Sequence, residues 1–268
     1  MIRLARAATV VAALASLPVL FPTTLAAQKP IVYGPGSARY HIISVVTRSQ
    51  EQGREIRITN EQEVSVQLAA HGSDTLDFAY TIDSSKVTSD PPIQLPDVSK
   101  LVGTRVQGAM SRHGKVYEIT SNAADSDANA QSLVEGMRRF LIPLPEDAAV
   151  GSSWTDTTRN SVSGDAGKLD MSTITTSRIA GDTTFEGKKA WRVERSAQLA
   201  IHGTQSQAGQ ELQVEGSGTG NGTFYLGADG TYLGSSATQS MNMRITLPST
   251  GQSVPITQAV TSRVEMIR

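Results

Sequence analysis

Residues 55–82, EIRITNEQEVSVQLAAHGSDTLDFAYTI, decide the fold, because apolar and polar side chains alternate along most of this stretch. An alternation with a period of two places successive side chains on opposite faces of a β-strand. The apolar face holds Ile56, Ile58, Val64, Val66 and Leu68, with Asn60 and Gln62 interrupting it, and then Leu76, Phe78, Tyr80 and Ile82. The polar residues 71–74, HGSD, are typical of a tight turn. The stretch therefore predicts a long antiparallel hairpin with one apolar face.

Similar alternation extends over the rest of the chain and predicts a mainly β protein. Further strands are expected near residues 106–119, 169–173, 191–201, 224–232, 241–247 and 256–266, with turns at 113–114, 186–188 and 228–230. We expect these strands to form a curved antiparallel sheet or an incomplete β-barrel.

Glycines occur in one glycine-rich stretch and at the expected turns. Residues 216–222, GSGTGNG, are followed by no Gly-Lys-Ser/Thr and by no helix pattern, so a flexible hairpin loop is expected there rather than a phosphate-binding loop. The glycines of the expected turns recur at similar spacings. This recurrence suggests two similar halves, residues 39–124 and 150–268, joined by residues 125–149.

One segment departs from the β pattern. Residues 127–141, DANAQSLVEGMRRFL, carry Leu133, Met137 and Phe140 at helical spacing, with acidic residues near the start and two arginines near the end. Such a charge distribution suits the helix dipole, and Pro143 ends the pattern. The sequence predicts one amphipathic helix over about 127–141, whose apolar stripe would pack on the concave face of the sheet.

The first residues predict the location of the protein. Arg3 and Arg6 precede an apolar run over residues 7–21, and the small residues 24–27, TLAA, resemble a signal-peptidase site. We therefore expect a signal peptide over 1–27 cleaved after Ala27, a flexible lead-in over 28–38 and a single β-rich domain over 39–268. The expected location is the periplasm or the medium, with no transmembrane segment after leader removal.

Composition excludes several function classes. Without the two arginines of the leader, 22 of the 24 basic residues remain against 25 acidic ones, which argues against nucleic acid as a partner. The chain has no cysteine, so neither disulfides nor lipid attachment at the leader junction is expected.

Motifs for metals, cofactors and catalysis are weak, and none of the three is expected. Asp125, Asp127 and Asn129 resemble the opening of a calcium loop, but Ala130 and Gly136 stand where glycine and glutamate belong. The four histidines are dispersed, and no GxSxG segment occurs. An enzyme of unrecognised type would need buried carboxylates or histidines gathered in one cleft.

Short motifs resemble a family of uncharacterised exported bacterial proteins. Residues 150–154, VGSSW, follow the proline-rich residues 143–145 and resemble the vGxxW segment of that family. Residues 222–226, 230–233 and 241–243 are similar to the hairpin in its second half. The resemblance covers most of the chain after the leader, implies a β-rich exported protein, and brings no activity and no catalytic residues. By shape alone, the expected fold resembles the lipoprotein-localisation carriers, whose unclosed β-barrel holds acyl chains beneath helices.

We therefore expect an exported, soluble, non-enzymatic envelope protein that binds an apolar or lipid-like ligand in a concave sheet. The residues expected to contact the ligand are Phe78, Tyr80, Leu133, Met137, Phe140, Trp191, Met241 and Met243. The alternative is an envelope scaffold or a protein-interaction module that uses a sheet edge or face and holds no small molecule.

Overall fold

A computed structural model of the chain describes residues 30–50, 53, 55–95, 97–122, 141–164, 167–207 and 210–267. The described residues form a single antiparallel sheet and one short 3-10 helix, Ser99–Leu101. The strands are β1 (Gly36–Gln50), β2 (Glu55–His71), β3 (Thr75–Asp90), β4 (Arg105–Ser111), β5 (Val116–Ser121), β6 (Ser153–Gly164), β7 (Gly167–Phe185), β8 (Lys188–Gln207), β9 (Gln210–Gly227), β10 (Tyr232–Leu247) and β11 (Gln252–Ile267). The expected signal peptide and helix lie outside the described residues, except for the buried Leu141.

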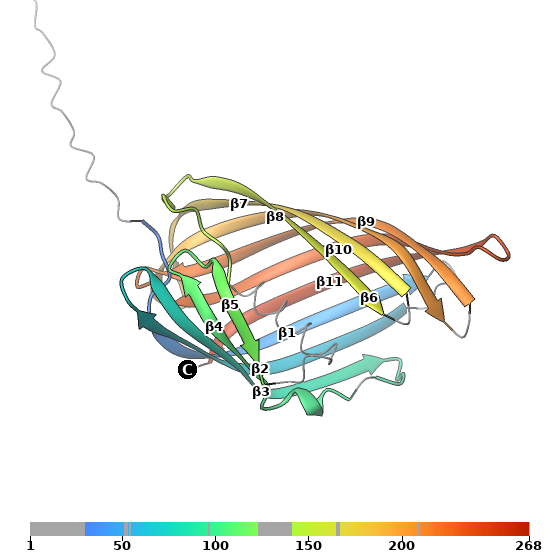
Figure 1. Cartoon of the computed structure of the whole chain (residues 1–268), viewed down its shortest axis with the longest axis horizontal. Helices are drawn as coiled ribbons and strands as arrows, with labels where there is room; N and C mark the ends of the chain where they lie inside the picture. Colours follow the sequence, from blue (N-terminus) through green and yellow to red (C-terminus); the bar gives the residue numbers. More distant parts are fainter. Residues whose placement is uncertain are drawn as a thin grey trace, which may run out of the picture.

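The strands form an antiparallel meander whose first and last members, β1 and β11, lie side by side in the middle of the sheet. Its strand order is β5-β4-β3-β2-β1-β11-β10-β9-β8-β7-β6, so the first and last strands pair with each other. The two edges, β5 and β6, are neighbours in the chain but do not pair. Figure 1 shows the sheet curled so that β7 to β10 arch above β1 to β3. The fold is therefore an open, strongly curved sheet, as the alternation predicts.

Long hairpins account for most of the sheet, and their turns fall where the sequence predicts them. β2 ends at His71 and β3 starts at Thr75, with Leu68 opposite Phe78 and Val66 opposite Tyr80. Further turns at 112–114, 186–187 and 228–230 connect β4 to β5, β7 to β8 and β9 to β10. These hairpins confirm the period-two analysis.

The glycine-rich residues 216–222 are not a loop, and this expectation is wrong. They lie inside β9 and pair on both sides, Gly218 with Leu199 of β8 and with Met241 of β10. A β-carbon on Gly218 would collide with the backbone oxygen of Ser240. Glycine is needed there because β10 approaches closely, as occurs where a sheet bends sharply.

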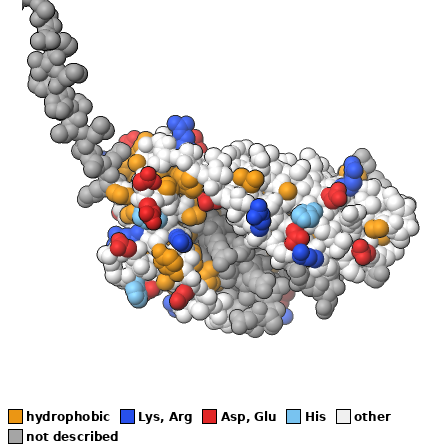
Figure 2. Space-filling model, turned by 45° about the horizontal axis from the view of Figure 1, so that its top comes forward, with side chains coloured by type: hydrophobic (Ala, Val, Ile, Leu, Met, Phe, Trp, Pro, Cys, Tyr) orange, Lys and Arg blue, Asp and Glu red, His pale blue; other side chains and the backbone are white. Residues whose placement is uncertain are grey.

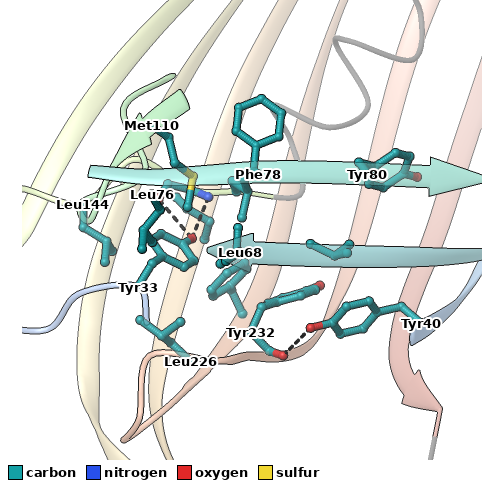
Figure 3. Close-up of a cluster of buried hydrophobic side chains, with 14 of the residues drawn as sticks. Tyr33, Tyr40, Leu68, Leu76, Phe78, Tyr80, Met110, Leu144, Leu226 and Tyr232 are labelled. Carbon is teal, nitrogen blue, oxygen red and sulfur yellow. Dashed lines mark hydrogen bonds between the residues drawn. The ribbon is translucent and has the colours of Figure 1, made fainter. Parts of the chain in front are cut away.

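The hydrophobic core fills one end of the curved sheet. It collects residues from the paired ends of β1, β2, β3, β4, β7, β8, β9 and β10, among them Val64, Leu76, Ile82, Val193 and Leu226, all fully buried. The rings of Tyr40 and Tyr232 pack there in a tilted arrangement, and the Tyr40 hydroxyl donates to the Tyr232 carbonyl oxygen at 2.8 Å (Figure 3). This end of the sheet is therefore packed like a protein interior.

The chain before β1 is anchored to this core, contrary to the expected flexible lead-in. Ile31 and Tyr33 are buried, and their amides donate to Ala148 and Arg112 at 2.9 and 2.7 Å. The Tyr33 hydroxyl accepts from the Ile142 amide at 2.9 Å and donates to its carbonyl oxygen at 3.1 Å. Residues 30–34 thus tie the segment between β5 and β6 to the core end of the sheet.

Candidate functional site

The candidate site lies on the sheet face that also carries the core, which we call the inner face. Strand register extends this face beyond the core, because every second residue of a strand points to the same side. On β8 the inner positions run from Trp191 and Val193 through Arg195 to Leu199 and Ile201. The inner face therefore changes from packed core to a charged position and then to a second apolar zone.

We call this second zone the far apolar zone, formed by Met171, Leu199, Ile201, Met241, Met243 and Ile256. None of its members belongs to the core cluster. A β-carbon placed on Gly216 would lie 2.8 Å from Met243 Cγ and 3.0 Å from Ile201 Cγ2, so these two side chains lean towards each other over the glycine. The glycines of β9 thus let side chains of β8 and β10 form one continuous apolar surface.

Between the core and the far apolar zone runs a band that we call the Arg195 row. It consists of residues directly opposite one another across successive strands: Trp154, Ser177, Arg195, Gly222, Ala237, Ser262, Ser44 and Asn60. Trp154 Nε1, Ser177 Oγ, Arg195 Nε and Asn60 Oδ1 are buried without a hydrogen-bond partner. Buried polar atoms normally have partners, so their gathering on one row is unusual.

Burial dominates the electrostatics of the inner face. It lowers the pKa of the Arg195 guanidinium, while Tyr33 and Asp156 oppose the shift. An arginine stays protonated in proteins, so Arg195 places a positive charge in a largely desolvated position. Burial also raises the pKa of four core tyrosines, Tyr33, Tyr40, Tyr80 and Tyr232, which keeps them neutral.

The structure divides the predicted ligand contacts into three groups. Phe78 and Tyr80 are buried in the core, and the half-buried Trp191 packs against it. Met241 and Met243 lie in the far apolar zone. Leu133, Met137 and Phe140 lie outside the described residues. The five described side chains therefore share the inner face but are not brought together at one point.

Sequence reasoning missed the Arg195 row, although one signal for it was available. Trp191, Val193, Leu199 and Ile201 alternate as an apolar series, and Arg195 occupies a position of the same parity. A charged residue on an apolar strand face is the kind of inconsistency that often marks a functional site. Ser177 carries no comparable signal, because Ser and Thr are common throughout β6 and β7. Trp154 stands out only as the last residue of the VGSSW segment, which does not connect it to Arg195.

One further small pocket is lined by described residues. A pocket of about 140 Å³ is lined by Phe185, Glu186, Lys188, Leu233 and Met266, a volume comparable with a cavity that holds one benzene molecule. No group of three histidine, aspartate or glutamate side chains that could hold a metal ion occurs in the described part of the chain. No described helix has the length and hydropathy needed to cross a membrane.

The surface in view in Figure 2 is mostly uncharged. Lys, Arg, Asp and Glu side chains are interspersed over the described part of that face, so neither sign of charge gathers into a broad patch there. Surface ion pairs such as that of Arg39 with Glu63, 2.9 Å apart, are exposed. Exposed pairs of this kind contribute little to stability.

Comparisons with known proteins give only distant likenesses. No protein-family model and no curated protein matches the sequence. DynF from the dynemicin biosynthesis pathway of Micromonospora chersina is 12% identical, with a TM-score of 0.27 over 88% of this chain and 83% of DynF. The hypothetical lipoprotein YmcC from Escherichia coli is 13% identical, with a TM-score of 0.19 over 81% of this chain and 85% of YmcC.

A LolA-superfamily protein from Nitrosomonas europaea is also among the similar solved structures. It is 7% identical, with a TM-score of 0.17 over 89% of each chain. At such low TM-scores none of these likenesses carries an argument about the fold or the function. The resemblance of residues 150–154 to the vGxxW segment and the analogy with lipoprotein-localisation carriers therefore stay predictions.

Proposed function

We propose that this chain is an exported, non-enzymatic protein of the cell envelope that holds an apolar or lipid-like ligand against its inner face. The observation that carries the proposal is the far apolar zone. Its six side chains continue the inner face outside the packed core, and all but Met241 are half-buried. Methionine side chains suit such a surface because they are flexible and polarisable and adapt to ligands of different shape.

The proposed ligand contacts are those of the far apolar zone, with Met241 and Met243 at its centre. Phe78, Tyr80 and Trp191 would support the ligand from the core end. Leu133, Met137 and Phe140 complete the proposed set on the basis of sequence alone. The envelope location rests on the features of residues 1–27, which are those of a secretory leader.

The first experiment measures whether an apolar ligand binds at all. Organic extraction and mass spectrometry of the purified protein should show a co-purified lipid. A neutral naphthylamine dye, which fluoresces in apolar surroundings, should bind and be displaced by a long-chain fatty alcohol. Absence of both co-purified lipid and dye binding would overturn the proposal.

The second experiment places the ligand on the inner face. Met243→Glu puts a carboxylate into the far apolar zone, so dye binding should weaken about tenfold or more. Asn242→Glu is the matched control, because the neighbouring side chain is exposed and points to the other face of β10. Equal dye affinities of the two variants would show that the ligand binds elsewhere.

The unpaired sheet edges support a second candidate function, as a protein-interaction module. β5 and β6 each have one strand neighbour in the described sheet, and β6 is 12 residues long. An exposed edge offers backbone donors and acceptors to a strand of a partner protein. This function would be favoured by a protein that carries no lipid and binds neither dye nor alcohol.

A further inference from the structure

Three buried hydrogen-bond donors converge on one part of the inner face. Trp154 lies directly opposite Ser177, and Ser177 lies directly opposite Arg195, on the adjacent strands β6, β7 and β8. Side chains directly opposite each other stand about 5 Å apart at their β-carbons. The three side chains therefore reach a common volume, and Trp154 Nε1, Ser177 Oγ and Arg195 Nε all lack a partner there.

Within the described residues, the positive charge of Arg195 is offset only in part. Its guanidinium forms no ion pair and donates no hydrogen bond to any residue in the described ranges. Asp156, two residues along β6 from Trp154, raises the pKa of Arg195 without an ion pair between them. Gly222 faces Arg195 from β9 and supplies no side chain. Neither residue directly opposite Arg195, Ser177 on β7 or Gly222 on β9, therefore supplies a negative charge.

The chemistry of these atoms selects the class of ligand group. Tryptophan Nε1 and the arginine nitrogens can only donate hydrogen bonds, and a serine hydroxyl can donate as well. An ordered water could satisfy Ser177 or Trp154, but a water cannot neutralise a buried guanidinium. A carboxylate or phosphate does both, because its oxygens accept several hydrogen bonds and carry the opposite charge.

We infer that Trp154, Ser177 and Arg195 form a binding site for an anionic oxygen group, and that the ligand is an acidic amphiphile. This inference rests on the proposed function, since the far apolar zone receives the hydrocarbon part. From Arg195 to Ile201 the inner face of β8 extends about 20 Å, which is comparable with an extended long-chain acyl group. Asn60 lies on β2, at the other end of the row from Trp154, and is not part of the site.

The test compares two ligands that differ only in the head group. Displacement of the neutral dye gives the affinities of a long-chain fatty acid and of the fatty alcohol of equal chain length, below their micellar concentrations. The wild-type protein should bind the acid about 10- to 100-fold more tightly than the alcohol, because only the carboxylate both accepts hydrogen bonds from the buried guanidinium and neutralises its charge.

Variants assign this preference to the site. Arg195→Gln should bring the ratio of the acid and alcohol affinities to about one. Arg192→Gln is the matched control and should keep the wild-type ratio, because Arg192 lies on the same strand, is exposed and points to the outer face. Trp154→Phe removes one donor and keeps an aromatic ring, so it should reduce the affinity for the acid by about fivefold. Far-UV circular dichroism reports whether each variant is folded.

The outcomes separate this inference from the proposed function. Equal wild-type affinities for acid and alcohol would overturn the inference and leave the proposed function standing. A preference for the acid that persists in Arg195→Gln would also overturn it. Failure of both ligands to bind would overturn the proposed function. It would also overturn the inference that the ligand is an acidic amphiphile.

A final arm distinguishes a lipid head group from a free anion. Trp154 and Trp191 are the two tryptophans of the chain, so Trp191→Phe leaves the Trp154 fluorescence as a direct reporter of the site. Inorganic phosphate should cause no saturable change in this fluorescence at millimolar concentration, whereas the fatty acid should. A saturable, Arg195-dependent response to inorganic phosphate would show that the site binds a free anion. This result would overturn the inference that the ligand is an acidic amphiphile.

Discussion

Arg195 is the residue at which stability and the proposed function are opposed. Its guanidinium is largely buried, and burial lowers its pKa. Among the described residues, nothing pairs with it. The nearby Asp156 offsets the effect of burial only in part, so the charge is expected to destabilise the ligand-free fold. Positions that are unfavourable in the free protein and favourable in the complex are expected at binding sites.

The first prediction concerns the stability of the ligand-free protein. Arg195→Met keeps much of the side-chain volume and removes the buried charge, so the free energy of unfolding should rise by about 1–3 kcal/mol. Urea titration of the delipidated protein measures this change. Arg192→Met, at an exposed position of the same strand, should change it by less than about 0.5 kcal/mol. A loss of stability in Arg195→Met would show that the guanidinium is compensated in the fold.

At the scale of elements, β9 shapes the site by having few side chains of its own. Gly216, Gly218, Gly220 and Gly222 occupy four successive inner positions, each between a residue of β8 and one of β10. Glycine weakens an isolated strand, but here it permits close approach of the neighbouring strands and strong curvature of the sheet. The same absence of side chains lets Ile201 of β8 and Met243 of β10 approach each other over Gly216.

The second prediction tests this role of β9. In Gly218→Ala the new methyl group would collide with the backbone oxygen of Ser240, so the free energy of unfolding should fall by about 1–3 kcal/mol. Gly220→Ala is the matched control, since a β-carbon there would stand 3.2 Å from the Thr238 oxygen and needs only a small shift. Thermal or urea unfolding of both variants gives the comparison. Equal stabilities would contradict the close-approach explanation.

At the scale of the molecule, contacts between distant parts of the chain hold one end of the curved sheet closed. The pairing of β1 with β11 brings Tyr40 to Tyr232, and residues 30–34 bind the segments around Ile142 and Ala148. Four neutral tyrosines are buried at this end. The core end is therefore the densely packed part of the molecule, and the ligand is proposed to bind on the inner face beyond it.

The third prediction follows from the pKa values of the four buried tyrosines. Burial raises each of them above the ordinary value of 10.0, so the folded protein retains protons that the unfolded chain loses. Stability from these groups is thus complete below about pH 10 and falls as the pH rises further, because the unfolded chain then binds fewer protons. Urea titrations between about pH 8 and pH 11 should show this loss.

A spectroscopic measurement checks the same linkage. Phenolate absorbance from the buried tyrosines should appear together with the loss of the β-sheet circular dichroism signal, not before it. Tyr80→Phe should make the decrease of stability with pH less steep. Ionisation of these tyrosines in a protein that keeps its full β-sheet signal would contradict the prediction.

The pattern of residues close together in the sequence was sufficient to predict the strands but not to predict the candidate site. Residues 55–82 reveal their hairpin because alternation and turn residues act within a few positions. For residues 216–222 the local pattern predicts a loop, because glycine is a poor strand former in isolation, yet the contact that requires glycine at 218 comes from Ser240. The prolines and glycines around Ile31 and Tyr33 predict a flexible segment, although both residues are buried. The two similar halves stay a prediction.

The sequence by itself determined the strands, their apolar faces and most of their turns, because these follow from neighbours along the chain. Only the tertiary structure decided that β1 joins β11, because strands with equal alternation can pair in many orders. It also brought Trp154, Ser177 and Arg195 into one row, although Trp154 and Arg195 are 41 residues apart in the sequence. Register across three strands, not spacing along one of them, creates that row, and no local pattern encodes register between distant strands.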